Sequence, residues 1–588
     1  MDAGSSTSRG RPMAASRVVT VALAALASAL AVAVTWCAVD IARTVVQARS
    51  LAAHLQSAQA AAESQDWRGV LDDLDASASQ ARSVADGTVS WPWRIAEALP
   101  VLGPTARALE QMSLPLAQML ASADSITPIA RRALDGEVRR PDGTIDLPAI
   151  EAAAPALVDL DERLRAGSHA LASIDRRGVI EPLASAIPAL QEATDRIRPA
   201  VSAAADTAGH LPTLLGADGP RTWLILLQNP AEARGAGGLV GGYLILRADE
   251  GAVQVVAAGT STQLTRHRIP LAAADADART TWGPVLSLWS GFNVSPDFAL
   301  TARLATAGMA ELGHKVDGVI AVDPFAVEAL LAATGPVTAE GRTLTADDVA
   351  DYYLVDEYVD EPNGRRRDEV GMALAQSAVS QALIGRLDLS AALPRLAAAA
   401  AGGRVRVWSS MPAEQEWLSG TPVSGLLPTD DVLVVGFNNA AGSKADAFVS
   451  TTAEYVVGTC PSGSAQSSLT LTLRNDMPMG LPTDNYGRKD LESGGSAAPA
   501  STSLHVHVLA PVGAGLPDAE LDGVPEDPYL DSLGDRVVWS TTVELPRERT
   551  RTLHFRFAAP PGPGRAALVA SPMALPTQVS AREEIACR

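Results

Sequence analysis

The sequence predicts a multidomain α+β protein with an N-terminal transmembrane helix, a helical stalk or bundle, a central α/β domain and a C-terminal β-sandwich-like domain. Three observations predict this order. Residues 18–39 are apolar and uncharged, apolar residues then recur at helical spacing to about residue 210, and β-type runs follow. A chain of 588 residues accommodates several such domains. We place them at residues 1–17, 18–39, 40–215, 216–445 and 446–588.

The uncharged run is long enough to cross a bilayer, because residues 18–39 would form a helix of about 33 Å. The short tail before it carries three arginines, Arg9, Arg11 and Arg17, against the single acid Asp2. By the positive-inside rule the tail stays in the cytoplasm. We therefore expect a single-pass type II protein of a bacterial plasma membrane, with everything after the run outside the cytoplasm.

A cleaved signal peptide is the alternative for this segment, because small residues at 27–29 resemble a cleavage site. The apolar run continues ten residues beyond them, which is longer than an ordinary signal core and favours a retained anchor. The bilayer is accordingly the first expected partner. Nucleic acid is excluded as a partner, since 67 acidic against 47 basic residues give a net charge of −20.

The segment after the anchor predicts several antiparallel amphipathic helices, because prolines interrupt the helical pattern too often for one coiled coil. An apolar, aromatic joint lies at residues 91–104 and contains Trp91 and Trp93. It is interpreted either as a buried corner between helices or as a contact with lipid head groups or a membrane partner.

From about residue 216, strand-like and helix-like runs alternate, which indicates an α/β domain. After residue 446 strands and turns prevail, which is typical of a β-sandwich. Cys37 falls in the apolar run, whereas Cys460 and Cys587 fall in the exported C-terminal part. A Cys460–Cys587 disulfide is the expected arrangement, and two unpaired buried thiols are the alternative.

Residues 228–243, with the sequence QNPAEARGAGGLVGGY, resemble the core signature of the bacterial domain-of-unknown-function 4012 family. Further matching pieces lie before this segment at residues 91–104 and after it, in order, at residues 295–298, 316–324, 334–337 and 438–444. The resemblance covers the chain from about residue 50 to the end. Membership of this family implies no particular activity.

A remoter resemblance is to the LytR-CpsA-Psr family, carried by the strand–helix unit at residues 316–337, residues 344–347, and an Arg-rich loop opening a helix that contains Gln376. That family consists of membrane-anchored enzymes that move glycopolymers from a polyprenyl pyrophosphate carrier to peptidoglycan, with Mg²⁺ and several arginines around the pyrophosphate. Where those enzymes carry charged residues after the first strand, this chain has Gln228 and Asn229, and residues 259–264 lack their Pro-Arg-Asp triplet.

Candidate ligand-binding residues lie in two segments. The first is a Gly-rich turn after a strand, where backbone N–H groups could surround an anion. Its alternative is a tight hairpin-like turn with Arg234 paired to Glu232 or to another acid. The second is a dense basic cluster that would attract an anion to a cleft, or else a solvated loop balanced by neighbouring acids. Together the candidates are Gln228, Asn229, Arg234, Gly237, Gly238, Arg365, Arg366 and Arg367.

Mg²⁺ is the one candidate cofactor, because Asp297, Asp317 and Asp323 could supply oxygen ligands. The alternative for Asp323 is an N-cap on a helix that begins at Pro324. No spacing typical of zinc sites or of a nucleophile elbow is present, and no catalytic residue is assigned.

Two functions stay open. One is a non-catalytic envelope protein that binds cell-wall glycan, a polyprenyl-linked glycan or partner proteins, which the missing charged triplet favours. The other is a Mg²⁺-dependent transferase of a polyprenyl-pyrophosphate-linked glycan. We expect Arg234 and the Arg365–Arg367 cluster to share one rim of the α/β domain and to bind an anion there. An apolar tunnel opening near them would suit a polyprenyl chain.

Overall fold

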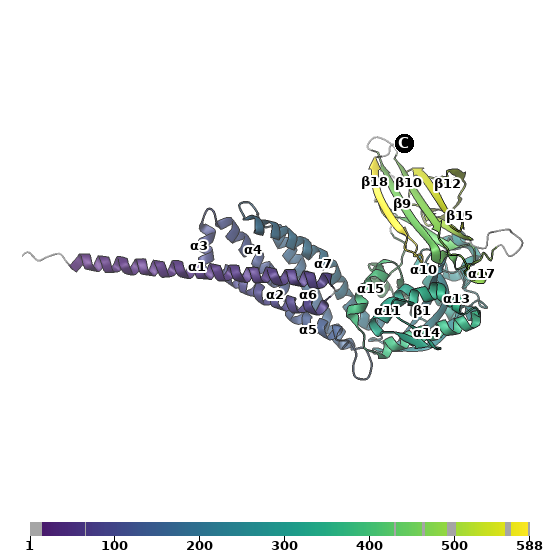
Figure 1. The fold of residues 1–588 in the computed structure, drawn as a ribbon, viewed down its shortest axis with the longest axis horizontal. Helices are drawn as coiled ribbons and strands as arrows, with labels where there is room; N and C mark the ends of the chain where they lie inside the picture. The colour runs from purple at the N-terminus through teal and green to yellow at the C-terminus, as the bar shows by residue number, and fades with distance from the viewer. Residues whose placement is uncertain are drawn as a thin grey trace, which may run out of the picture. The chain divides into compact units, whose positions relative to one another are not determined.

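The computed structural model describes residues 14–64, 66–428, 431–460, 465–490, 501–558 and 566–585. It contains two compact units, one built from Met1–Leu134 and Glu151–Gly209 and the other from Asp135–Ile150 and His210–Arg588 (Figure 1). The predicted α+β architecture with several sheets is confirmed.

The first unit is helical, as its periodic apolar residues predict. Its core contains Leu51, Val84, Leu116, Leu164 and Leu171. The prolines do less to break helices than we expect from the sequence, because α4, α5 and α6 continue through an internal proline. The helices are α1 (Ala14–Glu63), α2 (Trp67–Thr88), α3 (Trp91–Ala98), α4 (Gly103–Leu120), α5 (Ala123–Leu134), α6 (Leu147–Ala172) and α7 (Glu181–Leu214), the last two continuing into the second unit.

The predicted membrane span falls within α1, which runs without interruption from Ala14 to Glu63. Among the described residues, no helix is apolar enough over a sufficient length to cross a membrane. Most side chains of residues 18–33 lie outside the described part of the chain. The membrane anchor stays a prediction.

The second unit contains a five-stranded sheet of order β3-β2-β1-β4-β7. Its strands are β1 (Arg221–Arg234), β2 (Gly237–Asp249), β3 (Ala252–Thr260), β4 (Gly318–Val322) and β7 (Val405–Ser409). β1 pairs antiparallel with β2 and parallel with β4. Because side chains alternate along a strand, Leu224 and Leu226 face the core around α10 (Phe298–Glu311), whereas Ile225 and Leu227 face α14 (Gly364–Ile384).

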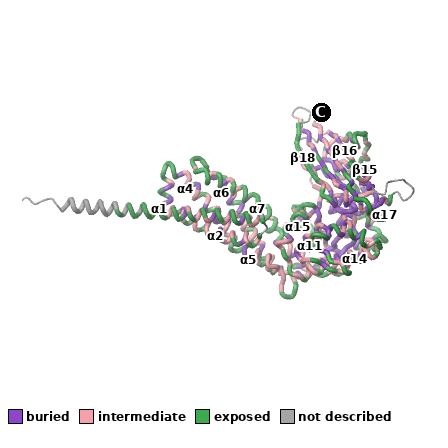
Figure 2. The backbone as a smooth tube through the Cα atoms, viewed as in Figure 1, coloured by how far each residue is buried: buried purple, intermediate pink, exposed green. Residues whose placement is uncertain are grey.

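Two further sheets pack around one core that includes Phe437, Tyr455, Trp539 and Phe555. Their orders are β13-β12-β16-β10-β9-β18 and β14-β15-β11-β8-β17, and their buried strands stand out in Figure 2. The strands are β8 (Leu433–Asn439), β9 (Val449–Thr459), β10 (Gln466–Asn475), β11 (Ser501–Leu509), β12 (Asp518–Leu521), β13 (Val524–Glu526), β14 (Tyr529–Leu533), β15 (Arg536–Pro546), β16 (Thr550–Ala558), β17 (Leu568–Ala570) and β18 (Gln578–Ile585). β8, which we place in the α/β domain from sequence, pairs instead with β11 and β17.

The remaining elements are short or cover the first sheet. They are the β5–β6 hairpin (Val337–Ala339 and Arg342–Leu344), the 3-10 turns at Leu271–Ala273, Gly283–Ser287 and Ala445–Phe448, a π-helical turn at Tyr352–Asp356, and the helices α8 (Ser261–Leu264), α9 (Ala276–Trp282), α11 (Pro324–Thr334), α12 (Val349–Asp351), α13 (Glu357–Asp360), α15 (Leu389–Ala401), α16 (Pro412–Ser419) and α17 (Thr483–Tyr486).

Cys460 is disulfide-bonded and Cys37 is a free thiol. β18 runs parallel to β9 and places Ile585 opposite Thr459, the residue before Cys460. This pairing brings the last described residue of the chain to the level of the bonded cysteine. Cys587, the partner that the sequence predicts, lies outside the described residues.

Candidate functional site

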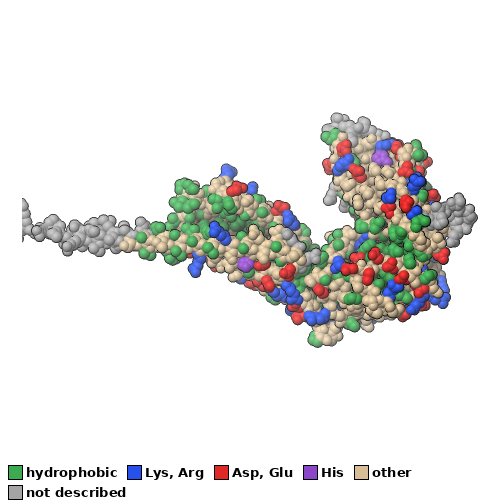
Figure 3. Space-filling model, viewed as in Figure 1, with side chains coloured by type: hydrophobic (Ala, Val, Ile, Leu, Met, Phe, Trp, Pro, Cys, Tyr) green, Lys and Arg blue, Asp and Glu red, His purple; other side chains and the backbone are tan. Residues whose placement is uncertain are grey.

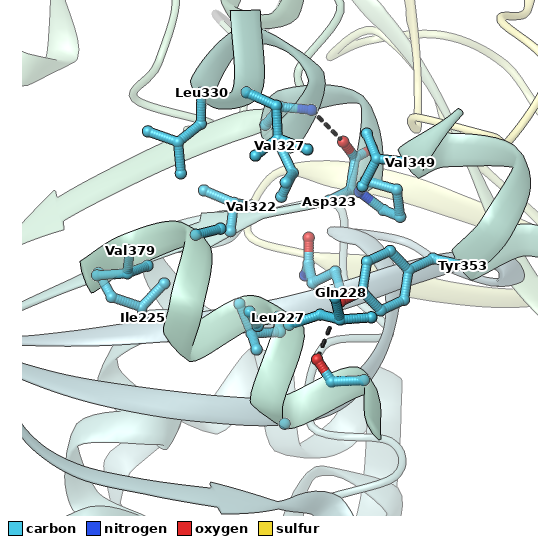
Figure 4. A pocket seen from close by; sticks show the side chains of 18 of the residues that line it. Ile225, Leu227, Gln228, Val322, Asp323, Val327, Leu330, Val349, Tyr353 and Val379 are labelled. Carbon is cyan, nitrogen blue, oxygen red and sulfur yellow. Dashed lines mark hydrogen bonds between the residues drawn. The ribbon is translucent and has the colours of Figure 1, made fainter. Parts of the chain in front are cut away.

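An apolar cavity of about 660 Å³ lies between the five-stranded sheet and the helices that cover one of its faces. Figure 4 shows Ile225, Leu227 and Val322 of the sheet pointing toward side chains of α11 and α14. The hydrophobic residues that line the cavity include Ile225, Leu227, Leu239, Leu246, Ile320, Val322, Val327, Leu330, Leu331, Val337, Leu344, Val349, Met372, Leu374, Ala375, Ala378, Val379, Ala382, Leu383, Leu387 and Leu396.

The cavity extends along almost the whole of α14. Arg367 in the first turn of this helix and Leu383 near its end both line it, and so do residues at nearly every turn between them. Sixteen residue steps at 1.5 Å each correspond to about 24 Å. A volume of this size and length admits one hydrocarbon chain laid along the helix.

Polar residues gather at the end of the cavity near the start of α14, and we call Asn229, Glu357, Tyr358, Arg367 and Lys444 the polar cluster. All five line the cavity. The Asn229 amide donates to the Tyr358 hydroxyl over 3.0 Å and to the Tyr353 carbonyl over 2.8 Å. The Arg367 guanidinium lies 4.7 Å from the centre of the Tyr358 ring, and the Lys444 ammonium lies 5.6 Å from it. Two cations and a buried carboxyl therefore surround one tyrosine.

Glu357 is the unusual group of this cluster. Its side chain is buried, and this burial raises its pKa to about 7, although the Tyr358 hydroxyl, Lys444 and Arg367 act in the opposite direction. Glu357 follows the π-helical turn at Tyr352–Asp356, a distortion that occurs often at functional sites. The cavity thus contains a carboxyl group that changes its charge near neutral pH.

Arg234 does not face the cavity, which corrects the expectation that it contacts a ligand. It is buried, and its Nη2 donates to Glu232 over 2.8 Å, while Nε and Nη1 donate to the carbonyls of Ser290 and Ala233. Lys444 Nζ lies 3.1 Å from the other Glu232 oxygen. Burial opposes the charge on Glu232, but Lys444 and Arg234 together lower its pKa to about 2. The structure therefore contains the ion pair between Arg234 and an acid, here Glu232, that the alternative interpretation predicts.

The Gly-rich segment forms the β1–β2 hairpin rather than an anion cradle. Arg234 pairs with Gly237, and the Gly235 and Ala236 N–H groups donate to Asn438 and to the Asn293 carbonyl. Gly237 has φ +130°, and a Cβ there would lie 2.3 Å from Gln228 Oε1. A Cβ on Gly238 would lie 2.2 Å from the Asn229 carbonyl carbon. These glycines let β1 and β2 approach at the irregular part of their register, where Gln228 and Asn229 reach the cavity.

The three clustered arginines separate from one another because they occupy the first turn of α14. Asn363 caps this helix and accepts from the Arg365 and Arg366 N–H groups. Arg365 is exposed, and Arg366 pairs with Glu340 over 2.9 Å. Arg367 alone of the three lines the cavity. Of the four arginines predicted to share one rim, only Arg367 therefore lines the cavity. Lys444 provides the second cation that we expect from Arg234.

The candidate Mg²⁺ ligands act as structural acceptors. Asp323 caps α11 by accepting from the Ala326 N–H over 3.1 Å, as its alternative interpretation predicts, and pairs with Arg404 over 3.0 Å. Asp297 caps α10, and Asp317 accepts from the Thr222 N–H. In the described part of the chain, no group of three or more His, Cys, Asp or Glu side chains is placed to hold a metal ion. The donor set does not fit a resident Mg²⁺.

Sequence reasoning missed Glu357, Tyr358 and Arg139, although it noted Lys444 within a family motif. Arg139 lines the cavity and donates to the Ala382 carbonyl over 2.6 Å, near the opposite end of α14. One usable signal was present for Glu357 and Tyr358. Both lie in the acidic, tyrosine-rich segment 351–361, directly before the Arg cluster.

A family model described as "Protein of unknown function (DUF4012)" matches residues 218–358. Neither the curated proteins nor the solved structures contain a significant match to this chain. The matched segment includes the β1–β2 hairpin, β4, α11 and the π-helical turn, and therefore much of the wall of the cavity. The resemblance to the DUF4012 family that the sequence predicts is thus confirmed for residues 218–358.

Proposed function

We propose that this protein is a membrane-anchored, extracytoplasmic protein of the bacterial envelope that holds an isoprenoid lipid bearing an anionic, glycan-linked head group. Binding without bond formation is the role that the geometry supports best. The observation that carries the proposal is the apolar cavity along α14 with Arg367 and Lys444 at one end.

The apolar chain is the first element of the proposed ligand. Burying a methylene group contributes about 0.8 kcal/mol, so about ten buried carbons contribute about 8 kcal/mol before ordering costs. That gross value corresponds to roughly micromolar affinity. Small residues on α14, such as Ala375 and Ala378, widen the space between the helix and the sheet. A flexible hydrocarbon chain can follow the space that these small residues leave along the helix.

The anionic head group is the second element. Arg367 can direct its remaining guanidinium N–H groups toward an anion, because among the described residues only its Nη1 donates a hydrogen bond, to the Glu361 carbonyl over 3.1 Å. The start of α14 adds the positive end of a helix dipole at the same place. Such a concentration of positive charge is needed in a protein with a net charge of −20.

The location rests on the sequence alone. The uncharged run at residues 18–39 and the three preceding arginines favour a single-pass anchor with the ligand-binding unit outside the cytoplasm. The resemblance of residues 316–337 to the LytR-CpsA-Psr family agrees with an isoprenoid-linked glycan, because β4 and α11 of this segment border the cavity.

Binding is tested by native mass spectrometry of the full-length protein in lipid nanodiscs with geranylgeranyl phosphate. Ala375→Phe places a ring in the cavity and should reduce binding at least tenfold. Ala373→Phe is the matched control, because Ala373 lies on the same helix, is also partly buried and does not line the cavity. Equal affinities of both variants and the wild type would contradict the proposal.

Transfer of the glycan is a second candidate, favoured by one observation. Glu357 is a buried carboxyl group in the cavity whose pKa is about 7, as a general acid or base requires. Incubating the full-length protein with a polyprenyl-linked glycan and peptidoglycan tests this role. A transferase would form a covalent product that Glu357→Gln abolishes without loss of lipid binding, whereas a binding protein would form none.

A further inference from the structure

The helical unit exposes a patch of large hydrophobic side chains at one end. Val101 is 81% exposed, Leu102 54%, Ile95 50% and Trp91 44%. These residues belong to α3 and to the α3–α4 turn, where Figure 3 shows hydrophobic side chains gathered. We call Trp91, Ile95, Leu99, Val101 and Leu102 the apolar tip. A contiguous exposed patch of this kind marks an interaction surface.

The apolar tip is not an incomplete hydrophobic core, because the same segment also has a side that is buried against neighbouring helices. Trp93 is 6% exposed, packs with Ala96 and Ala106, and donates its indole N–H to Thr44 Oγ1 over 3.3 Å. Trp91 and Ile95 are four residues apart and share the opposite face of α3. The segment therefore combines both interpretations that its sequence leaves open, with Trp93 as the buried corner and the tip as a surface.

The tip lies beside the part of α1 where the uncharged run ends, and this position points to a lipid partner. The Trp91 ring stacks on the Trp36 ring, with centroids 5.3 Å apart and planes inclined by 16°. Trp36 is half exposed and lies only about 4.5 Å along the helix before residue 39, where the uncharged run ends. Asp40, the first charged residue after the run, accepts from Ser90 Oγ over 2.6 Å. α3 thus begins at the level where α1 changes from apolar to charged.

We infer that the apolar tip is a second membrane contact, which lies in the head-group region of the outer leaflet beside the point where α1 enters the bilayer. Paired tryptophans suit this depth, because an indole has an apolar body and a polar N–H. The exposed Arg94 on α3 can reach lipid phosphates while its stem stays near the tip. The contact holds the helical unit against the membrane by two points instead of one.

This inference rests on the proposed membrane anchor but not on lipid binding in the cavity. It is tested with the full-length protein in vesicles of phosphatidylcholine and phosphatidylglycerol that contain a nitroxide-labelled lipid. A fluorophore is attached to natural Cys37, or to Val101→Cys or Val158→Cys in a C37A background. Val158 is the matched control, because it is an exposed valine of the same unit, on α6 and outside the tip. The nitroxide quenches fluorophores that lie close to the lipid.

The expected result is strong quenching at positions 37 and 101 and at least severalfold weaker quenching at position 158. Quenching at position 37 without quenching at 101 would overturn the inference and leave the anchor intact. Absence of quenching at both positions would overturn the anchor and the inference together. Equal quenching at positions 101 and 158 would show unspecific adhesion and would also overturn it.

Discussion

Replacing Glu357 by glutamine should stabilise the folded protein at neutral and alkaline pH. Burial raises the pKa of this carboxyl from 4.5 to about 7, so the unfolded chain loses its proton at lower pH than the folded chain. The stability cost accumulates between about pH 4.5 and 7 and is complete above pH 7. A rise of about 2.5 pH units at about 1.4 kcal/mol each gives about 3–4 kcal/mol. Glutamine keeps the shape without the charge.

The assay is urea unfolding of the full-length protein and its Glu357→Gln variant at about pH 8 and at pH 4.5. The variant should be about 3–4 kcal/mol more stable at pH 8 and nearly equal to the wild type at pH 4.5. Glu369→Gln, an exposed position on α14, is the control and should change little at either pH. A destabilised Glu357→Gln variant at pH 8 would refute the reasoning, because Glu357 would then be stabilised as an anion. A glutamate kept at such a cost is typical of a functional site.

Three further predictions concern the residues that support the site. Gly237→Ala should lower the free energy of unfolding by about 1–3 kcal/mol, because φ at this residue is +130° and the added Cβ would meet Gln228. Gly241→Ala should be nearly neutral in the same unfolding assay, because its Cβ would have no neighbour closer than 4.0 Å. Lys444→Met should lower the free energy of unfolding by about 3–5 kcal/mol, because it leaves the buried Glu232 with Arg234 as its one cationic partner. A Lys444→Met/Glu232→Gln double variant should recover part of that loss. If the two substitutions had strictly additive effects on the free energy of unfolding, the ion pair would be contradicted. Peptide mapping without reduction should recover Cys460 linked to Cys587, and a Cys460 peptide carrying a free thiol would disprove this link.

Much of the fold follows from local sequence patterns. Helical periodicity after the apolar run and β-type alternation after residue 446 predict the kinds of elements that form, because burial of one face requires those periods. Strand partners are not local information. β8 looks like any other buried strand in the sequence, and only the three-dimensional packing shows that it pairs with β11 rather than with β4. The segment Asp135–Ile150 similarly joins the second unit although helices surround it.

The sequence predicts which types of residue occur near the site better than it predicts which of them line the cavity. Arginines and glycines near an anion site are reasonable candidates, but a sequence does not tell which arginine is already paired. Arg234 lies two residues from Glu232 and satisfies its donors internally, whereas Arg367 reaches the cavity because of its angular position on α14. Lys444 and Glu357 are distant in sequence from Asn229, and the fold alone brings them together.

The central claim is that the cavity along α14 holds the apolar chain of an anionic isoprenoid lipid. The most direct measurement is photo-cross-linking of the full-length protein in nanodiscs with a prenyl phosphate that carries a diazirine in its chain, followed by peptide mass spectrometry. The account predicts cross-links to cavity-lining residues of α11 and α14, such as Leu330 and Val379, and their loss in Ala375→Phe. Cross-links confined to α1 and the apolar tip would contradict it, because the probe would then only be dissolved in the membrane.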